Sequence, residues 1–166
     1  MRTAPLWTLV VAIVLSTLAL SGGGAVPAAA ESLAGQASVI DGDTIEIHGQ
    51  RIRLFGIDAV ESRQRCIRGG QQWNCGKDSA FALADRIGRA AIDCRGVERD
   101  RYRRLVAVCF KGAEDLNRWM VEQGWAVAYR RYSLDYVQAE EAAKAAGRGL
   151  WSGSFEMPWE WRKTAH

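Results

Sequence analysis

The segment IDGDTIEIHGQRIRLFGIDAVE, residues 40–61, constrains the fold more than any other part of this chain. Two strand-like runs flank His48-Gly49, a pair typical of a two-residue hairpin turn because glycine adopts positive φ at little cost. Pairing the runs outward from this turn places Glu46 opposite Arg51 and Thr44 opposite Arg53. In this register one face of the hairpin carries four large apolar side chains: Ile45, Ile47, Ile52 and Leu54.

Carboxylates stand at both ends of this predicted hairpin. Asp41 and Asp43 precede it, and Asp58 and Glu61 follow it. The register brings Asp43 to Arg53 at the end away from the turn, and the continuing chain carries Asp58 toward the same end. An oxygen-rich cluster beside a guanidinium suits Ca²⁺ or Mg²⁺ better than zinc or copper. The alternative is that the Asp-Gly pair is an ordinary turn and Asp58 only ends a strand.

A second hairpin is predicted from residues 91–94 to residues 105–110, with an arginine-rich loop between its arms. The net charge of +3 for the whole chain says little about partners, but the arginines are unevenly placed. Such clusters suit a phosphate-rich partner, although a charge run is more often a solvated face. Five of them fall close together in this loop: Arg95, Arg99, Arg101, Arg103 and Arg104.

Helical spacing of apolar residues predicts two helices, over residues 76–89 and 114–123, the second ending at Gly124. A third helix is predicted to be capped by Ser133 and closed by Gly147. Strands in the first half, helices interspersed later and no βαβ rhythm predict an α+β domain with a small antiparallel sheet or barrel. The first helix is expected to face the core with Ala80, Phe81, Leu83, Ala84 and Ile87.

The first thirty residues have the pattern of a secretory signal peptide. Arg2 precedes an apolar run over residues 6–20, and small residues follow up to Ala30. An uncleaved membrane anchor is the alternative, but the run is shorter than the ~20 residues needed to span a bilayer. We therefore expect residues 1–30 to be removed and residues 31–166 to form a single domain that is not attached to a membrane.

An even number of cysteines after an export signal predicts two disulfides rather than reactive thiols. Proximity in sequence favours a bridge between the first two, and the second predicted hairpin favours a bridge between the last two. Zinc is a weak alternative, because the chain has no CxxC pair and its only histidines are His48 and His166. The four cysteines are Cys66, Cys75, Cys94 and Cys109.

Five segments, IDGDT, RLFGIDAVE, DRYRRLVAV, LNRWMVEQGWAVAY and GLW, resemble the staphylococcal nuclease (thermonuclease) family. They occur in the family order over residues 36–152, and the exported, cysteine-containing bacterial branch looks most similar. The resemblance implies a five-stranded OB-fold β-barrel with three α-helices. It also implies a Ca²⁺-dependent endonuclease that hydrolyses DNA and RNA and leaves 3′-phosphate ends.

The resemblance also implies roles for single residues. Asp43 and Asp58 match the calcium-binding aspartates, and Ala59 stands where the family supplies a backbone carbonyl to the ion. Glu61 matches the glutamate that orients or deprotonates the attacking water. Two arginines are implied to grip the phosphate and two tyrosines to border the nucleotide: Arg53 and Arg104, and Tyr102 and Tyr129.

Two positions depart from the family pattern. Val60 replaces the proline that would restrict the loop carrying Glu61. Arg103 replaces a glycine next to Arg104, and if that position has positive φ, a side chain there costs ~1–2 kcal/mol or shifts the turn. We therefore expect a site that is complete in its side chains but less tightly preorganised.

Two functions remain after these arguments. The first is a secreted or periplasmic, monomeric calcium-dependent endonuclease acting on nucleic acid. The alternative is a non-catalytic OB-fold binding module, since some members of the family are associated with succinoglycan biosynthesis. The complete set of carboxylates and arginines favours the enzyme, because a module that only binds has no reason to keep it.

Overall fold

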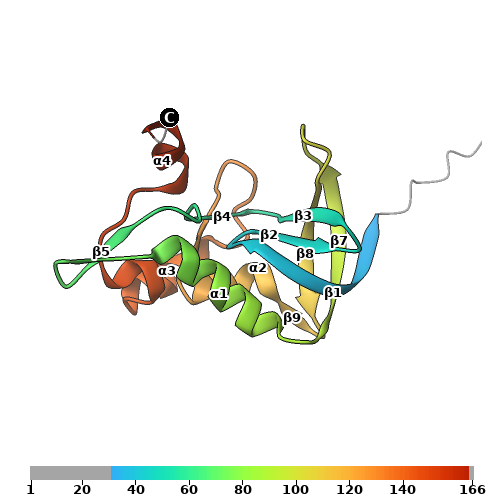
Figure 1. Ribbon diagram of the computed structural model, residues 1–166, viewed down its shortest axis with the longest axis horizontal. Coiled ribbons are helices and arrows are strands. Elements are labelled where there is room, and N and C mark those ends of the chain that lie inside the picture. Colours follow the sequence, from blue (N-terminus) through green and yellow to red (C-terminus); the bar gives the residue numbers. More distant parts are fainter. Residues whose placement is uncertain (1–30, 165–166) are drawn as a thin grey trace, which may run out of the picture.

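A closed five-stranded barrel forms the centre of the computed structural model, which describes residues 31–164 (Figure 1). Its strands pair antiparallel in the order β3-β2-β1-β7-β8, and a parallel pairing of β3 with β8 closes the barrel. The predicted α+β class with a five-stranded OB-fold barrel is therefore confirmed. The barrel strands are β1 (Ser32–Asp41), β2 (Thr44–Ile47), β3 (Gln50–Leu54), β7 (Ala91–Arg99) and β8 (Leu105–Lys111).

The predicted register of the first hairpin is confirmed. Thr44 pairs with Arg53, and every pair up to the turn follows the expected order. The turn residues His48 and Gly49 have φ of 51° and 76°, the conformation that a two-residue hairpin turn requires. The four apolar side chains of the inner face are buried in the main core: Ile45, Ile47, Ile52 and Leu54.

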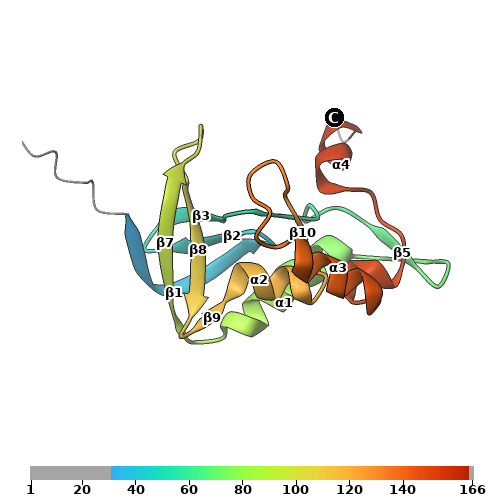
Figure 2. The same ribbon diagram turned by 180° about the vertical axis from the view of Figure 1, so that it is seen from behind.

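Helices cover the barrel on one side and at one end (Figures 1 and 2). Three of them correspond to the three predicted helices, and α4 adds a fourth near the carboxyl end of the chain. The helices are α1 (Cys75–Ile87), α2 (Leu116–Glu122), α3 (Val137–Ala145) and α4 (Pro158–Thr164), with a 3₁₀ turn, η1 (Gly149–Ser152). The remaining strands are β4 (Ile57–Ala59), β5 (Cys66–Arg68), β6 (Gln71–Trp73), β9 (Glu114–Asp115) and β10 (Ala126–Ala128).

Two details of the helix predictions are wrong. Phe81 is 63% exposed, because α1 turns the face of Ser79, Leu83 and Ile87 inward and leaves Phe81 on the outside. Ser133 does not cap α3: its Oγ accepts a hydrogen bond from the N–H of Asp135 at 3.0 Å, two residues before the helix begins. The loop forms a local turn instead, so the serine hydroxyl already accepts a backbone hydrogen bond before the helix starts.

Both predicted disulfides are present. Cys94 and Cys109 are opposite each other in the β7–β8 hairpin, and their sulfurs are bonded. Cys66 is bonded to Cys75, which joins β5 to the first residue of α1. All four cysteines are buried, and Cys66 and Cys75 belong to a small separate cluster with Val60.

Asn117 connects three parts of the fold from inside the core. Its Oδ1 accepts from the N–H of Cys109 at 3.1 Å, and its Nδ2 donates to the carbonyls of Phe55 at 2.9 Å and Ala107 at 3.1 Å. The side chain is fully buried, so these bonds replace water that cannot reach it. The loop between β3 and β4, which carries the chain from Arg53 to Asp58, is thereby held against β8.

The predicted signal peptide, residues 1–30, lies outside the described residues. Within residues 31–164 no helix has the length and the apolar character to cross a membrane.

Candidate active site

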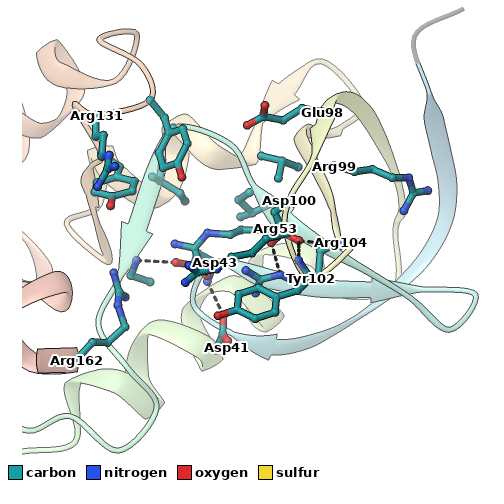
Figure 3. A pocket seen from close by; sticks show the side chains of 18 of the residues that line it. Asp41, Asp43, Arg53, Glu98, Arg99, Asp100, Tyr102, Arg104, Arg131 and Arg162 are labelled. Carbon is teal, nitrogen blue, oxygen red and sulfur yellow. Dashed lines mark hydrogen bonds and ion pairs between the residues drawn. The ribbon is translucent and has the colours of Figure 1, made fainter.

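Three segments project on the same side of the molecule: the β7–β8 loop, the loop after β10, and α4 (Figures 1 and 2). They surround a cavity of about 700 Å³ above the β3–β4 segment. Carboxylates, guanidiniums and tyrosine rings line it (Figure 3). Most of the residues predicted as functional line it although they come from distant parts of the sequence: Asp43, Arg53, Ala59, Glu61, Tyr102, Arg104 and Tyr129. Asp58 is fully buried and does not line it.

Asp43 lies at the bottom of the cavity, in the turn between β1 and β2. The turn is fixed by the N–H of Asp43, which donates to Asp41 Oδ1 at 3.0 Å. It also packs closely against α1 and β4: a Cβ added to Gly42 would stand 2.1 Å from Ser79 Oγ. The Oδ2 atom of Asp43 accepts from the N–H of Ala59 at 3.0 Å, so β4 holds this carboxylate from the other side.

Arg53 joins the two aspartates. Its Nη1 donates to Asp43 Oδ1 at 3.1 Å and its Nη2 to Asp58 Oδ1 at 2.8 Å. Asp58 is fully buried, in the short strand β4 paired with β10. The register argument from the sequence, which brought Asp43, Arg53 and Asp58 to one end of the hairpin, agrees with these contacts.

Burial dominates the electrostatics of this group. Desolvation raises the pKa of Asp43 to about 6; the positive charge of Arg53 opposes the rise, and the negative charge of Asp41 adds to it. Burial by itself lowers the pKa of Arg53, but the facing carboxylates of Asp43 and Asp58 raise it above its ordinary value. The site is therefore an under-solvated anionic pocket in which a positive charge is strongly stabilised.

Glu61 follows β4 in a loop that is restrained without the family proline. Val60 is buried in the small cluster with the Cys66–Cys75 bridge and Leu150, so packing limits the loop in place of a ring. The N–H of Glu61 donates to Oε1 of the buried Gln64 at 3.2 Å. The loop is thus held at both Val60 and Glu61, and the expected loosening is counteracted.

Arg104 lies at the tip of the β7–β8 hairpin. Its Nε donates to Asp100 Oδ2 at 2.7 Å, while Asp100 Oδ1 accepts from the backbone N–H groups of Tyr102 and Arg104, both at 2.9 Å. The two Nη groups of Arg104 make no hydrogen bond to any residue in 31–164. Arg103 has a φ of 65°, so the expected left-handed position is present and carries a side chain.

Arg162 is a site residue that sequence reasoning missed. It belongs to α4, and its Nη2 donates to Asp58 Oδ2 at 2.7 Å. Its Nη1 donates to Asp58 Oδ1 at 3.1 Å and to Glu61 Oε1 at 2.8 Å. The sequence showed a basic residue near the carboxyl end, but no local pattern connects it with carboxylates about a hundred residues earlier.

Comparison with known proteins identifies the family. A family model described as staphylococcal nuclease homologue matches residues 51–153. This chain belongs to the staphylococcal nuclease family. The nuclease relatives include the Micrococcal nuclease of Shigella flexneri, which is 31% identical over an alignment of 158 residues; the alignment covers 84% of this chain and 86% of that protein.

Two further relatives of this family member have different names. The Succinoglycan biosynthesis protein ExoI of Rhizobium meliloti (strain 1021) is 44% identical over 127 residues, 74% of this chain and 66% of that protein. An Uncharacterized endonuclease of Haemophilus influenzae is 34% identical over 133 residues, 75% of this chain and 70% of that protein. This chain therefore spans just under two thirds of the length of the ExoI protein.

The aromatic residues of this nuclease-family site are arranged in two groups. Tyr102 is exposed at the hairpin tip, beside the Arg104 guanidinium, whose centre is 5.5 Å from the ring centroid. Tyr129 stacks on Trp159 of α4, with ring centroids 5.7 Å apart, and also contacts Tyr132. One face of the Tyr129 ring is therefore covered by the terminal helix.

The donor set of the nuclease-family site fits a hard cation. Among residues 31–164 no three acidic, histidine or cysteine side chains stand close enough to hold a metal by themselves. Two buried carboxylates, Asp43 and Asp58, share the Arg53 guanidinium. Burial holds the pKa of Asp43 above its ordinary value although Arg53 opposes the rise, so the compensation of its charge is partial. A divalent cation held by these two groups would supply that compensation.

Proposed function

We propose that this protein is an exported endonuclease that uses Ca²⁺ to hydrolyse phosphodiester bonds in DNA and RNA, leaving 3′-phosphate ends. The observation that carries the proposal is the convergence of Asp43, Arg53 and Glu61 at a cavity whose wall also carries Arg104. Buried Asp58 lies directly behind Arg53 and accepts a hydrogen bond from it. The two disulfides support an oxidising compartment, either the periplasm or the exterior of the cell. The proposed working form is a monomer.

In this proposal Asp43 and Asp58, with the backbone carbonyl of Ala59, would hold the calcium ion. When bound, the ion supplies positive charge that neutralises the phosphate and acts as a Lewis acid. Oxygen ligands from carboxylates and a backbone carbonyl are those that Ca²⁺ prefers. Arg53 already holds both carboxylates at its two Nη groups, which fixes their orientation before the ion arrives.

Arg53 and Arg104 would bind the phosphate oxygens. A guanidinium presents two parallel N–H donors that match a phosphate and stays charged at any working pH. The free Nη groups of Arg104 lie in the cavity wall, while its Nε is held by Asp100. Tyr102, beside this arginine, and Tyr129, across the cavity, would border the sugar and base.

Glu61 would accept the proton of the attacking water. Its carboxylate lies at the cavity edge, partly exposed, so that water can reach it. As the water oxygen bonds to phosphorus, the P–O5′ bond breaks, the 5′-oxygen takes up a proton from solvent and leaves as a hydroxyl, and the phosphate stays on the 3′ end. General base catalysis of this kind contributes about 10²–10⁴-fold to the rate.

A second candidate is a binding module that holds a polyanion without cutting it. Two observations favour it: Arg162 already pairs with Asp58 and Glu61, and one relative is named for succinoglycan biosynthesis. In that case the guanidiniums would bind anionic groups, and the carboxylates would only keep the arginines in place.

The test is nuclease activity of the purified, disulfide-bonded protein on single-stranded DNA and on RNA, with Ca²⁺ and with a chelator. We expect cutting only with Ca²⁺ and a fall of about 10²–10⁴-fold in kcat for Glu61→Gln. Glu114→Gln is the matched control, because Glu114 pairs with Arg86 outside the cavity. A folded wild-type protein that binds these polymers but never cuts them would favour the binding module.

A further inference from the structure

The terminal segment that carries Arg162 is firmly docked. Ile67 and Ser154 exchange two backbone hydrogen bonds of 2.9 Å, and Gln64 Nε2 donates to the carbonyl of Glu156 at 2.6 Å. Trp159 stacks on Tyr129. These contacts involve the backbone and other side chains, so α4 has an anchorage that does not depend on Arg162.

Arg162 occupies the carboxylate oxygens that a cation needs. Both oxygens of Asp58 accept hydrogen bonds from it, and the Oδ2 atom has no other partner among the described residues. Asp58 is fully buried and has no face turned to solvent. A calcium ion would coordinate such oxygens at about 2.3–2.6 Å, so it competes with the guanidinium for the same electron pairs.

Side-chain exposure indicates which of the two guanidiniums gives way when a dication binds. The side chain of Arg162 is 37% exposed and that of Arg53 is 22% exposed, so Arg162 can move into solvent with less rearrangement of its surroundings. Arg162 lies in the short helix α4, whereas Arg53 lies in the barrel strand β3.

We propose that Arg162 is an internal competitor of the divalent cation: it pairs with Asp58 and Glu61 when the site is empty of metal, and cation binding displaces it. The inference rests on the proposed cation site. Its consequence is a cation affinity lower than the carboxylates alone would provide, and a Glu61 that is released for catalysis only when the cation is present.

The test is calorimetric titration of Ca²⁺ into the full, oxidised protein without nucleic acid. We expect Arg162→Gln to bind Ca²⁺ at least tenfold more tightly than wild type. The affinity of Arg162→Lys should be intermediate, because lysine keeps the positive charge but cannot donate to both carboxylate oxygens with a planar guanidinium. Lys163→Gln is the matched control. It removes the same charge from the same helix, but within residues 31–164 Lys163 pairs with Glu160 alone. We therefore expect the Ca²⁺ affinity of Lys163→Gln to be within twofold of wild type.

Each outcome decides the matter. Arg162→Gln with unchanged affinity, or with the same gain as Lys163→Gln, overturns the competition. Weaker binding also overturns it and makes Arg162 a residue that positions the carboxylates for the ion. If wild type and Arg162→Gln, both folded by circular dichroism, bind no Ca²⁺, then the cation site fails and the inference fails with it. In that case nuclease activity with another cation or with none would show which part of the proposed function survives.

Discussion

Replacing Arg53 by glutamine should reveal how much the interactions within the candidate active site contribute to the free energy of unfolding. The variant loses two charge-assisted hydrogen bonds, to Asp43 and to Asp58, each worth about 1.5–3 kcal/mol. Asp58 keeps its two bonds from Arg162, and Asp43 keeps those from Thr44 and Ala59. We therefore expect the lower part of the summed range, a loss of about 3 kcal/mol in the free energy of unfolding at pH 8.

The loss should depend on pH in a definite direction. The pKa of Asp43 is raised to about 6 mainly by burial, so between pH 4 and pH 6 the native state binds more protons than the unfolded state, and stability falls as pH rises through this window. Without the positive charge of Arg53, the pKa of Asp43 rises further, so the pH range over which stability falls extends to higher pH. At pH 5 the Asp43 of the variant is protonated, and the loss should shrink to about 1–1.5 kcal/mol.

The assay is equilibrium unfolding in urea at pH 5 and pH 8, with a chelator present, followed by tryptophan fluorescence. Arg104→Gln is the control: it also removes one guanidinium, whose side-chain hydrogen bond within residues 31–164 goes to Asp100. Asp100 keeps the hydrogen bonds from the backbone N–H groups of residues 102 and 104, which favour its charged form at both pH values. We expect the control to lose about 1 kcal/mol at either pH. A loss below 1 kcal/mol for Arg53→Gln at pH 8, or equal losses at pH 5 and pH 8, would refute the reasoning.

Three further predictions concern stability, each measured by urea unfolding. Asn117→Ala should cost about 3 kcal/mol because it leaves the buried N–H of Cys109 and carbonyl of Phe55 without partners; a loss under 1 kcal/mol would contradict this. Replacing Cys94 and Cys109 together by alanine opens a loop with a separation of 15 residues and should cost about 3 kcal/mol, because the unfolded chain gains freedom; a loss under about 1 kcal/mol would contradict this. Arg103→Gly should stabilise the protein by about 0.5 kcal/mol, since it removes a side chain at φ 65° but adds freedom to the unfolded chain; destabilisation would show that the side chain has contacts of its own.

The predictions that succeeded depend on short distances along the chain. Alternating apolar residues and the His48-Gly49 turn determine a register, and that register places Asp43 beside Arg53. Cysteines in facing arms of a hairpin determine the pairing of Cys94 with Cys109. The errors came where a pattern has a second solution: Ser133 was equally able to form a turn with Asp135, and did so.

The amino-acid sequence by itself determined the barrel hairpin, the disulfide partners and the approach of Asp43 to Arg53, because each follows from local periodicity, turn chemistry or spacing. Only the tertiary structure decided that α4 returns to the site and that Arg162 meets Asp58 and Glu61. That contact spans about a hundred residues and depends on how η1, the Gln64 contact and the Trp159 stack direct the chain. No local pattern encodes such a path, because it results from the sum of packing contacts made after the individual elements have formed.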